Sequence, residues 1–99
     1  MNLDEFRQTV SAAEPPALGL PLQALWHDAK GDWHLAHLTA QGDESSDGAW
    51  VHAYLHRKEG DISNAGYWCR RAGRPDARGP LENEWSDIAS ELLRNTDEQ

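Results

Sequence analysis

A chain of 99 residues is long enough for one domain and too short for two. Its formal net charge of −8 argues against general binding to nucleic acid or to an anionic membrane. No apolar run is long enough to span a bilayer, the acidic N-terminal segment lacks the features of a signal peptide, and Cys69 has no second cysteine to pair with. We therefore expect a soluble cytoplasmic protein whose fold needs no disulfide.

The composition predicts an all-α fold. β-Branched aliphatic residues are scarce, with two Val and two Ile, and these are the residues that strands favour. Five tryptophans supply most of the large apolar surface, so we expect them to form the core: Trp26, Trp33, Trp50, Trp68 and Trp85.

The two ends of the chain predict flanking helices. An amphipathic pattern indicates a first helix at about 3–13, which Pro15 and Pro16 should end. Pro21 suits the first turn of the next helix. A second amphipathic stretch indicates a last helix at about 81–94, and residues 95–99 should fray.

Between these ends the sequence repeats with an offset of 29 residues, so that Ala24, Leu25 and His27 correspond to Ala53, Tyr54 and His56. The same offset relates Gly31-Asp32 to Gly60-Asp61 and Ala36 to Ala65. A glycine that ends one helix and an aspartate that caps the next is the expected turn chemistry. This pattern predicts two tandem antiparallel helix–turn–helix units within about 20–78, with helices at about 22–30, 32–41, 47–59 and 61–72.

The second unit resembles tetratricopeptide-type repeats in Gly60, Asp61, Ala65, Ala72 and Pro75, with Cys69 where that family prefers an aromatic residue. The offset of 29 differs from the 34 residues of those repeats. The resemblance implies stacked antiparallel helices that present a groove to a partner peptide. The segment 50–61 is also similar to an uncharacterised family of small helical proteins, which implies no mechanism.

Histidines provide the first candidate site. His52, His56 and Glu59 share one arc of a predicted helix, and His34 and His37 share an arc of the preceding one. If the two arcs face each other, four imidazoles and a carboxylate would line a cleft suited to a divalent metal or a small ligand. The alternative is that these are structural or surface histidines, since His27 and His56 are equivalent in the repeat and both precede a Gly-Asp turn.

Arginines provide the second candidate site. Arg70, Arg71 and Arg74 lie at the end of a predicted helix and suit an anion or an acidic peptide. The alternative is internal pairing with the acidic last helix through Glu82, Glu84, Asp87 or Glu91. Cys69 is expected to be a buried, unreactive thiol, although neighbouring arginines favour a lowered thiol pKa.

The repeat and the local excess of arginine favour a protein- or peptide-binding module that needs no cofactor and exists as a monomer or a homodimer. The alternative is a histidine-lined protein that binds a divalent metal or a small ligand, with an enzymatic role left open.

Overall fold

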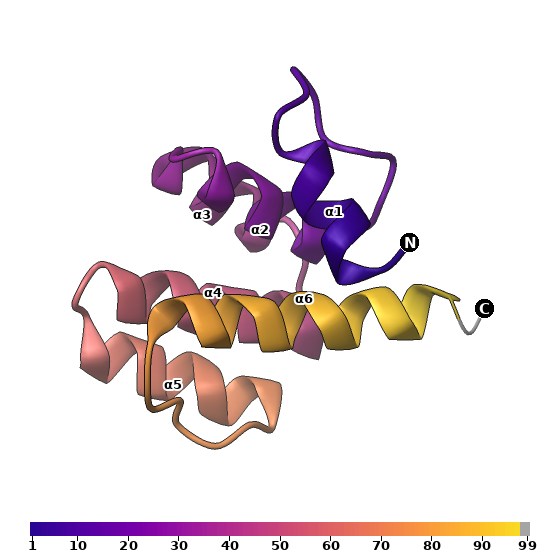
Figure 1. Cartoon of the computed structure of the whole chain (residues 1–99). Coiled ribbons are helices and arrows are strands. Elements are labelled where there is room, and N and C mark those ends of the chain that lie inside the picture. The colour runs from indigo at the N-terminus through magenta and orange to yellow at the C-terminus, as the bar shows by residue number, and fades with distance from the viewer. Residues whose placement is uncertain (98–99) are drawn as a thin grey trace.

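The computed structural model describes residues 1–97 and places six helices and no strand in them (Figure 1). The helices are α1 (Leu3–Thr9), α2 (Leu20–Ala29), α3 (Trp33–Gln41), α4 (Ser46–Lys58), α5 (Ile62–Ala72) and α6 (Leu81–Asp97). The all-α prediction is therefore confirmed for the described residues. Within that range no helix combines the length and apolarity that crossing a membrane requires.

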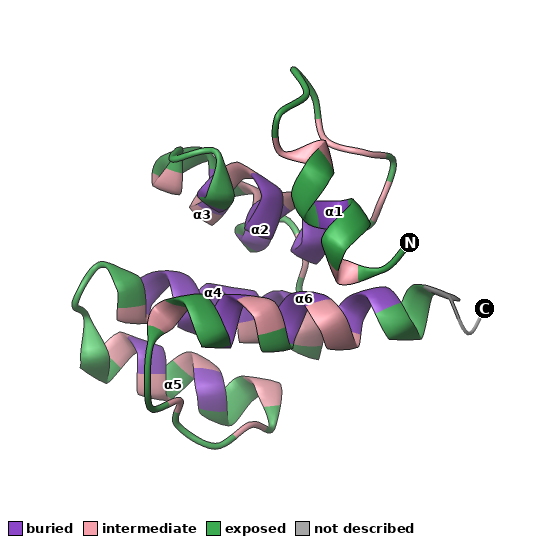
Figure 2. Cartoon of the chain, in the orientation of Figure 1, coloured by how far each residue is buried: buried purple, intermediate pink, exposed green. Residues whose placement is uncertain are grey.

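The layers are visible in Figure 1, where α4 and α6 lie between α1–α3 on one side and α5 on the other. The most extensive helix contacts are those of α4 with α5 and of α2 with α3. Helix α6 packs on α1, α2 and α4, so it joins the two ends of the chain to the middle. Buried residues line the facing sides of α2, α4 and α6 (Figure 2).

Two of the predicted helix ends are wrong. Helix α1 stops at Thr9 although 3–13 was predicted, because Phe6 is its one buried residue and little packing supports a further turn. Its start is held by a capping box, in which Asn2 Oδ1 accepts from the Glu5 backbone N–H at 2.8 Å. Helix α6 continues to Asp97 although fraying was predicted from residue 95, since Leu92 and Leu93 are buried beneath its last turns. Residues 98 and 99 lie outside the described residues.

The turns after α2 and α4 have the same geometry. Gly31 and Gly60 adopt φ values of 91° and 92°, which glycine tolerates and other residues rarely adopt. In each turn the following aspartate caps the next helix, with Asp32 Oδ1 accepting from Leu35 N–H at 3.1 Å and Asp61 Oδ1 from Asn64 N–H at 3.3 Å. The Gly-Asp sequence thus forms the same break twice.

The core is built from Phe6, Leu25, Val51, Leu55 and Ile88, all fully buried, together with two tryptophans. Trp26 and Trp85 are buried, and Trp85 Nε1 donates to the Leu25 carbonyl at 3.0 Å. Trp33 and Trp50 are partly buried and pack against this core. The prediction that all five tryptophans form the core is wrong for Trp68, which stacks on His52 instead.

A buried polar contact ties α2 to α4. Asp28 is 4% exposed, accepts from Tyr54 Oη at 2.6 Å and pairs with Lys58 Nζ at 2.9 Å. Burial raises the pKa of Tyr54, and the hydrogen bond to Asp28 adds to this effect. The contact keeps Tyr54 a neutral donor and fixes the rotation of α4 relative to α2.

Candidate metal centre

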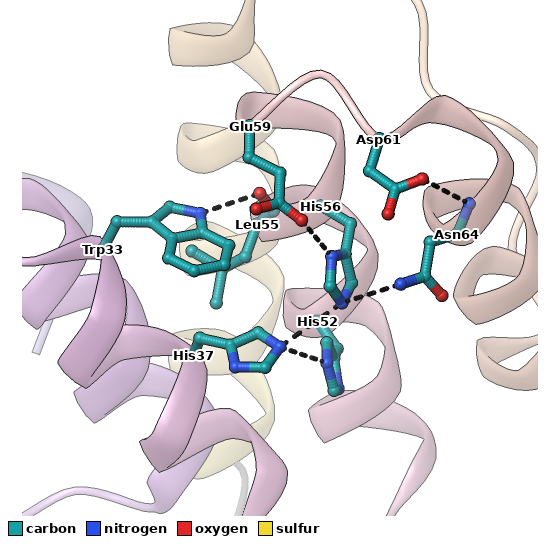
Figure 3. A network of polar contacts seen from close by, with 8 residues as sticks. All are labelled: Trp33, His37, His52, Leu55, His56, Glu59, Asp61 and Asn64. Atoms are coloured by element: carbon teal, nitrogen blue, oxygen red, sulfur yellow. Dashed lines mark hydrogen bonds and ion pairs between the residues drawn. The ribbon is translucent and has the colours of Figure 1, made fainter.

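Three histidine rings from two helices meet between α3 and α4. His37 Nε2 lies 2.9 Å from His52 Nε2 and 3.4 Å from His56 Nε2. One nitrogen from each ring falls within 4.8 Å of the other two. Figure 3 shows the three rings pointing toward one another. The structure thus brings together His37 from the predicted arc on α3 with His52 and His56 from the predicted arc on α4.

The spacing of these nitrogens suits a tetrahedral metal ion. Zinc binds imidazole nitrogen at about 2.0–2.1 Å, which places two tetrahedral ligands roughly 3.3 Å apart. The separations of 2.9 and 3.4 Å from His37 Nε2 lie close to that value.

Glu59 fixes the protonation of His56. The His56 Nδ1–Glu59 Oε1 distance is 2.7 Å, and a carboxylate can only accept, so Nδ1 carries the proton and donates it. The lone pair of neutral His56 is therefore on Nε2, which faces the other two rings. A carboxylate behind a histidine is the common outer partner in metal sites. Glu59, a candidate ligand in the sequence analysis, instead contacts the His56 nitrogen that is not directed at His37.

Aromatic rings hold two of the histidines in place. Trp33 stacks on His37 with ring centroids 5.0 Å apart, and Trp68 stacks on His52 at 3.9 Å. Trp33 is itself fixed, because its Nε1 donates to the Leu55 carbonyl at 2.8 Å (Figure 3). The two stacks restrict ring rotation, so the imidazoles keep their nitrogens directed inward.

Burial favours the neutral form of two of the three rings, His37 and His52. It lowers the pKa of His52 to about 4, and the neighbouring His37 and His56 add to the effect. The pKa of His37 is lowered mainly by burial and then by His56. Neutral imidazoles have free lone pairs, so at neutral pH a metal ion would not need to displace protons from these two rings.

Asn64, Trp33 and Asp61 belong to this region and were not singled out as site residues from the sequence. Asn64 Nδ2 lies 3.4 Å from His56 Nε2, and Asp61 groups with His56 and Glu59 as a second set of oxygen and nitrogen donors. Asn64 is three positions after Asp61, the N-cap of α5. A side chain at this position can reach back past the start of its own helix, toward the end of α4. That spacing was the available signal for Asn64.

Two other histidines lie outside the cluster. His34 is exposed on α3. The predicted set of four imidazoles is therefore wrong for His34, which does not join the cluster. Its position one residue after Trp33 turns it away from α4. His27 packs edge-on against Trp26. The repeat equivalence of His27 and His56 therefore does not extend to their side-chain surroundings, because α5 and Glu59 surround only His56.

The three candidate arginines have different surroundings in the structure. Arg74 pairs with Glu91 of α6 and lies over the Trp50 ring, as the internal-pairing alternative predicted. Arg71 is exposed and lies near the rings of Trp68 and Tyr67. Arg70 is exposed on α5. Arg57, which had no predicted role, forms an ion pair with the buried Glu84 at 2.8 Å.

Cys69 is buried, and burial raises the pKa of its thiol. The nearby Arg70 acts in the opposite direction but more weakly than burial. The activating reading of the neighbouring arginines is therefore wrong, and the prediction of a buried, unreactive thiol agrees with its position.

Protein-family models, curated proteins and solved structures were all compared with the chain, and none matches it.

Proposed function

We propose that this protein binds Zn²⁺ through Nε2 of His37, His52 and His56. The convergence of these three nitrogens carries the proposal. Three features support it. The pKa values of His37 and His52 are lowered, and Glu59 orients His56. Trp33 and Trp68 stack on His37 and His52 and limit the rotation of these two rings. Imidazole ligands in near-tetrahedral spacing favour zinc over the harder ions Mg²⁺ and Ca²⁺.

Three histidines leave one coordination position for a water molecule. Zinc with three protein ligands and a water is the arrangement of catalytic zinc sites, in which the pKa of the water falls to about 7. Hydrolysis or hydration is therefore the reaction class to test if the protein proves to be an enzyme. A structural zinc that ties α3 to α4 is the other role this ligand set supports.

The test is a zinc titration of chelator-treated, tag-free protein by calorimetry, with elemental analysis of the purified protein. We expect one saturable site in the wild type. Replacing both His52 and His56 by Ala should abolish it, and His37→Asn, at a less buried ring, should weaken zinc binding more than about 100-fold, because a ligand is lost. The exposed His34→Ala is the matched control and should bind zinc normally.

Circular dichroism of each variant separates loss of a ligand from loss of the fold. Zinc binding that survives unchanged in the double variant, or the absence of any saturable site in the folded wild type, would rule out the proposal.

A peptide-binding helical module is the second candidate, and we propose for it two tandem units formed by α2–α3 and α4–α5. The matching geometry of the Gly31 and Gly60 turns favours the repeat. Tyr67 is 45% exposed beside Arg71 on α5, which favours docking of an acidic peptide there. The double variant Arg70→Glu, Arg71→Glu should then lose every captured partner, whereas unchanged capture would exclude this surface.

A reducing compartment such as the cytoplasm remains our proposal for location, on the ground that Cys69 is a buried free thiol. Self-association of the chain into a homodimer through its repeat-like units is part of the same second candidate.

A further inference from the structure

A pocket of about 370 Å³ opens beside the histidine cluster. His52 and Trp68 belong to its wall together with Arg71, and Asp43, Glu44 and Ala49 line it from the loop before α4 and from α4 itself. The volume falls in the range of small-molecule sites, which combine apolar walls with a few convergent polar groups. Of the three clustered histidines, His52 alone lines this pocket. A ligand in the pocket can therefore contact the proposed metal site at the His52 ring.

His52 lines this pocket and has one ring nitrogen without a partner. Its Nε2 faces His37, and among the described residues its Nδ1 has no hydrogen-bond partner. In the same part of the chain Trp26 Nε1 is the side-chain nitrogen that is both fully buried and unpartnered. Nδ1 of His52 therefore keeps some access to solvent, and we take the pocket that His52 lines as the route by which a ligand reaches it.

Metal binding decides what this nitrogen does. When Nε2 of a neutral imidazole gives its lone pair to a metal ion, the ring proton must be on Nδ1. A metal-bound histidine usually donates that proton to a carboxylate, a carbonyl oxygen or water. For His56 the acceptor is Glu59. For His52 no described residue is hydrogen-bonded to Nδ1, which leaves the acceptor position to water or to a ligand in the pocket.

Arg71 adds a second donor on the same wall. It is exposed, and its guanidinium carbon lies 5.0 Å from the centre of the Trp68 ring, which itself stacks on His52. Stacking orients the planar guanidinium, and its fork of N–H groups matches a carboxylate. Asp43 and Glu44 also line the pocket, and their negative charge disfavours a doubly charged phosphate more than a singly charged carboxylate.

We infer that this pocket binds a small organic carboxylate, which accepts a hydrogen bond from His52 Nδ1, pairs with Arg71 and thereby strengthens metal binding. The inference rests on the proposed zinc site. Because the carboxylate becomes the outer partner of a metal ligand, its effect should be that of other outer partners, about tenfold or more in metal affinity. Linkage requires zinc to strengthen carboxylate binding by the same factor.

The experiment titrates zinc into chelator-treated protein in sodium benzoate and in sodium chloride of equal ionic strength, with correction for zinc bound by benzoate itself. Benzoate is the probe because its ring suits the apolar part of the pocket wall. We expect zinc to bind about tenfold more tightly in benzoate. Arg71→Gln should bind zinc as the wild type does in chloride and lose the benzoate effect, whereas the matched control Arg70→Gln should keep both.

Nitrogen-15 spectra of the histidine rings give a second measurement that does not depend on a variant. Addition of benzoate to the zinc-loaded protein should move the Nδ1–H signal of His52 downfield and leave that of His56, which already donates to Glu59, in place. An unchanged His52 signal would contradict the proposed hydrogen bond.

The remaining outcomes separate the two proposals. Equal zinc affinity in both salts would overturn the inference and leave the zinc site intact, whereas no zinc binding in either salt would overturn the site itself. A benzoate effect that persists in Arg71→Gln would show that the carboxylate occupies the fourth metal position and would also overturn the inference. So would an effect produced only by phosphate, or only by a glutamate-rich peptide.

Discussion

The contact between His56 and Glu59 shows how one side chain sets the chemistry of another. The 2.7 Å separation assigns the proton to Nδ1 and leaves Nε2 as the lone-pair nitrogen that faces His37. Glu59 is at the C-cap of α4, and its side chain is 37% exposed, so it contributes little to the core. Its role in the proposed site is to position His56 and not to bind the ion.

Replacement of Glu59 by Gln tests this role. The variant keeps the size of the side chain but removes the charge that makes His56 a better ligand, so zinc affinity should fall about 10–100-fold. The free energy of unfolding of the metal-free protein should change little, because Glu59 is exposed. A zinc titration of Glu59→Gln beside the exposed Glu82→Gln measures the difference, and equal affinities in the two variants would exclude a positioning role.

The lowered pKa of His52 predicts a pH-dependent stability of the metal-free protein. The folded pKa of about 4 lies below the ordinary 6.5, so between these values the unfolded chain binds more protons than the folded one. This contribution is complete above pH 6.5 and is lost as the pH falls toward 4. At about 1.4 kcal/mol per pKa unit it amounts to roughly 3 kcal/mol at most.

Urea unfolding in the presence of a chelator, repeated across that pH range, measures this dependence. His52→Gln should make the curve less steep between pH 6.5 and 4, with part of the remaining slope due to His37, whose pKa is also lowered. The exposed His34→Gln should leave the slope unchanged. Curves of equal slope for the two variants would contradict the prediction.

Among the helices, α4 has the central place. It carries His52 and His56 toward α3, and Tyr54 and Val51 toward the core. Its rotation is set by the Asp28 contact on one side and by the Gly60 turn that leads into α5. Because the site takes one ligand from α3 and two from α4, its geometry depends on how these two helices are held.

The two Gly-Asp turns predict matched effects of substitution. An alanine at Gly31 or at Gly60 would meet no atom within 4 Å, but it would be forced into φ values of 91° and 92°. The cost should be about 1–2 kcal/mol at each position, from backbone strain alone. Gly66→Ala, inside α5, is the control of opposite sign, because alanine in a helix interior should stabilise the protein by about 0.5–1 kcal/mol.

Thermal or urea unfolding of the three variants measures these free energies. Losses at Gly31 and Gly60 that differ by more than about 1 kcal/mol would contradict the structural equivalence of the two turns, since the strain alone predicts the same cost at each.

For the whole molecule, the proposed zinc joins the α2–α3 half to the α4–α5 half. Helices α3 and α4 contact each other less than either contacts its own partner, so a shared ion would add a link where packing is thinner. A ligand that binds only the folded state at 100 times its Kd adds about 2.7 kcal/mol to the free energy of unfolding.

Saturating zinc should therefore raise the Tm of the chain by roughly 10–20 °C, since 1 kcal/mol corresponds to about 4–8 °C at this size. Differential scanning calorimetry with zinc and with a chelator gives the measurement. The His52→Ala, His56→Ala double variant should show no zinc-dependent shift, and a shift of the same size in that variant would point to zinc bound elsewhere.

The sequence by itself determined the helical class and most helix boundaries. Periodic apolar positions, the Gly-Asp breaks and the scarcity of β-branched residues are local properties, and local backbone preferences act in the same way wherever the helix lies. The same periodicity placed His52, His56 and Glu59 on one arc of α4. It failed at the end of α1 and at the end of α6, where packing against distant residues decides how many turns persist.

Only the tertiary structure decided which of these residues meet. His34 and His37 share an arc, yet His37 joins the cluster and His34 faces outward, because the rotation of α3 against α4 selects between them. The same is true of Trp68, which leaves the core to stack on His52, and of Arg74, which pairs with Glu91 while Arg71 faces the pocket. Helix rotation and packing depend on contacts between residues far apart in the chain, and no local pattern contains that information.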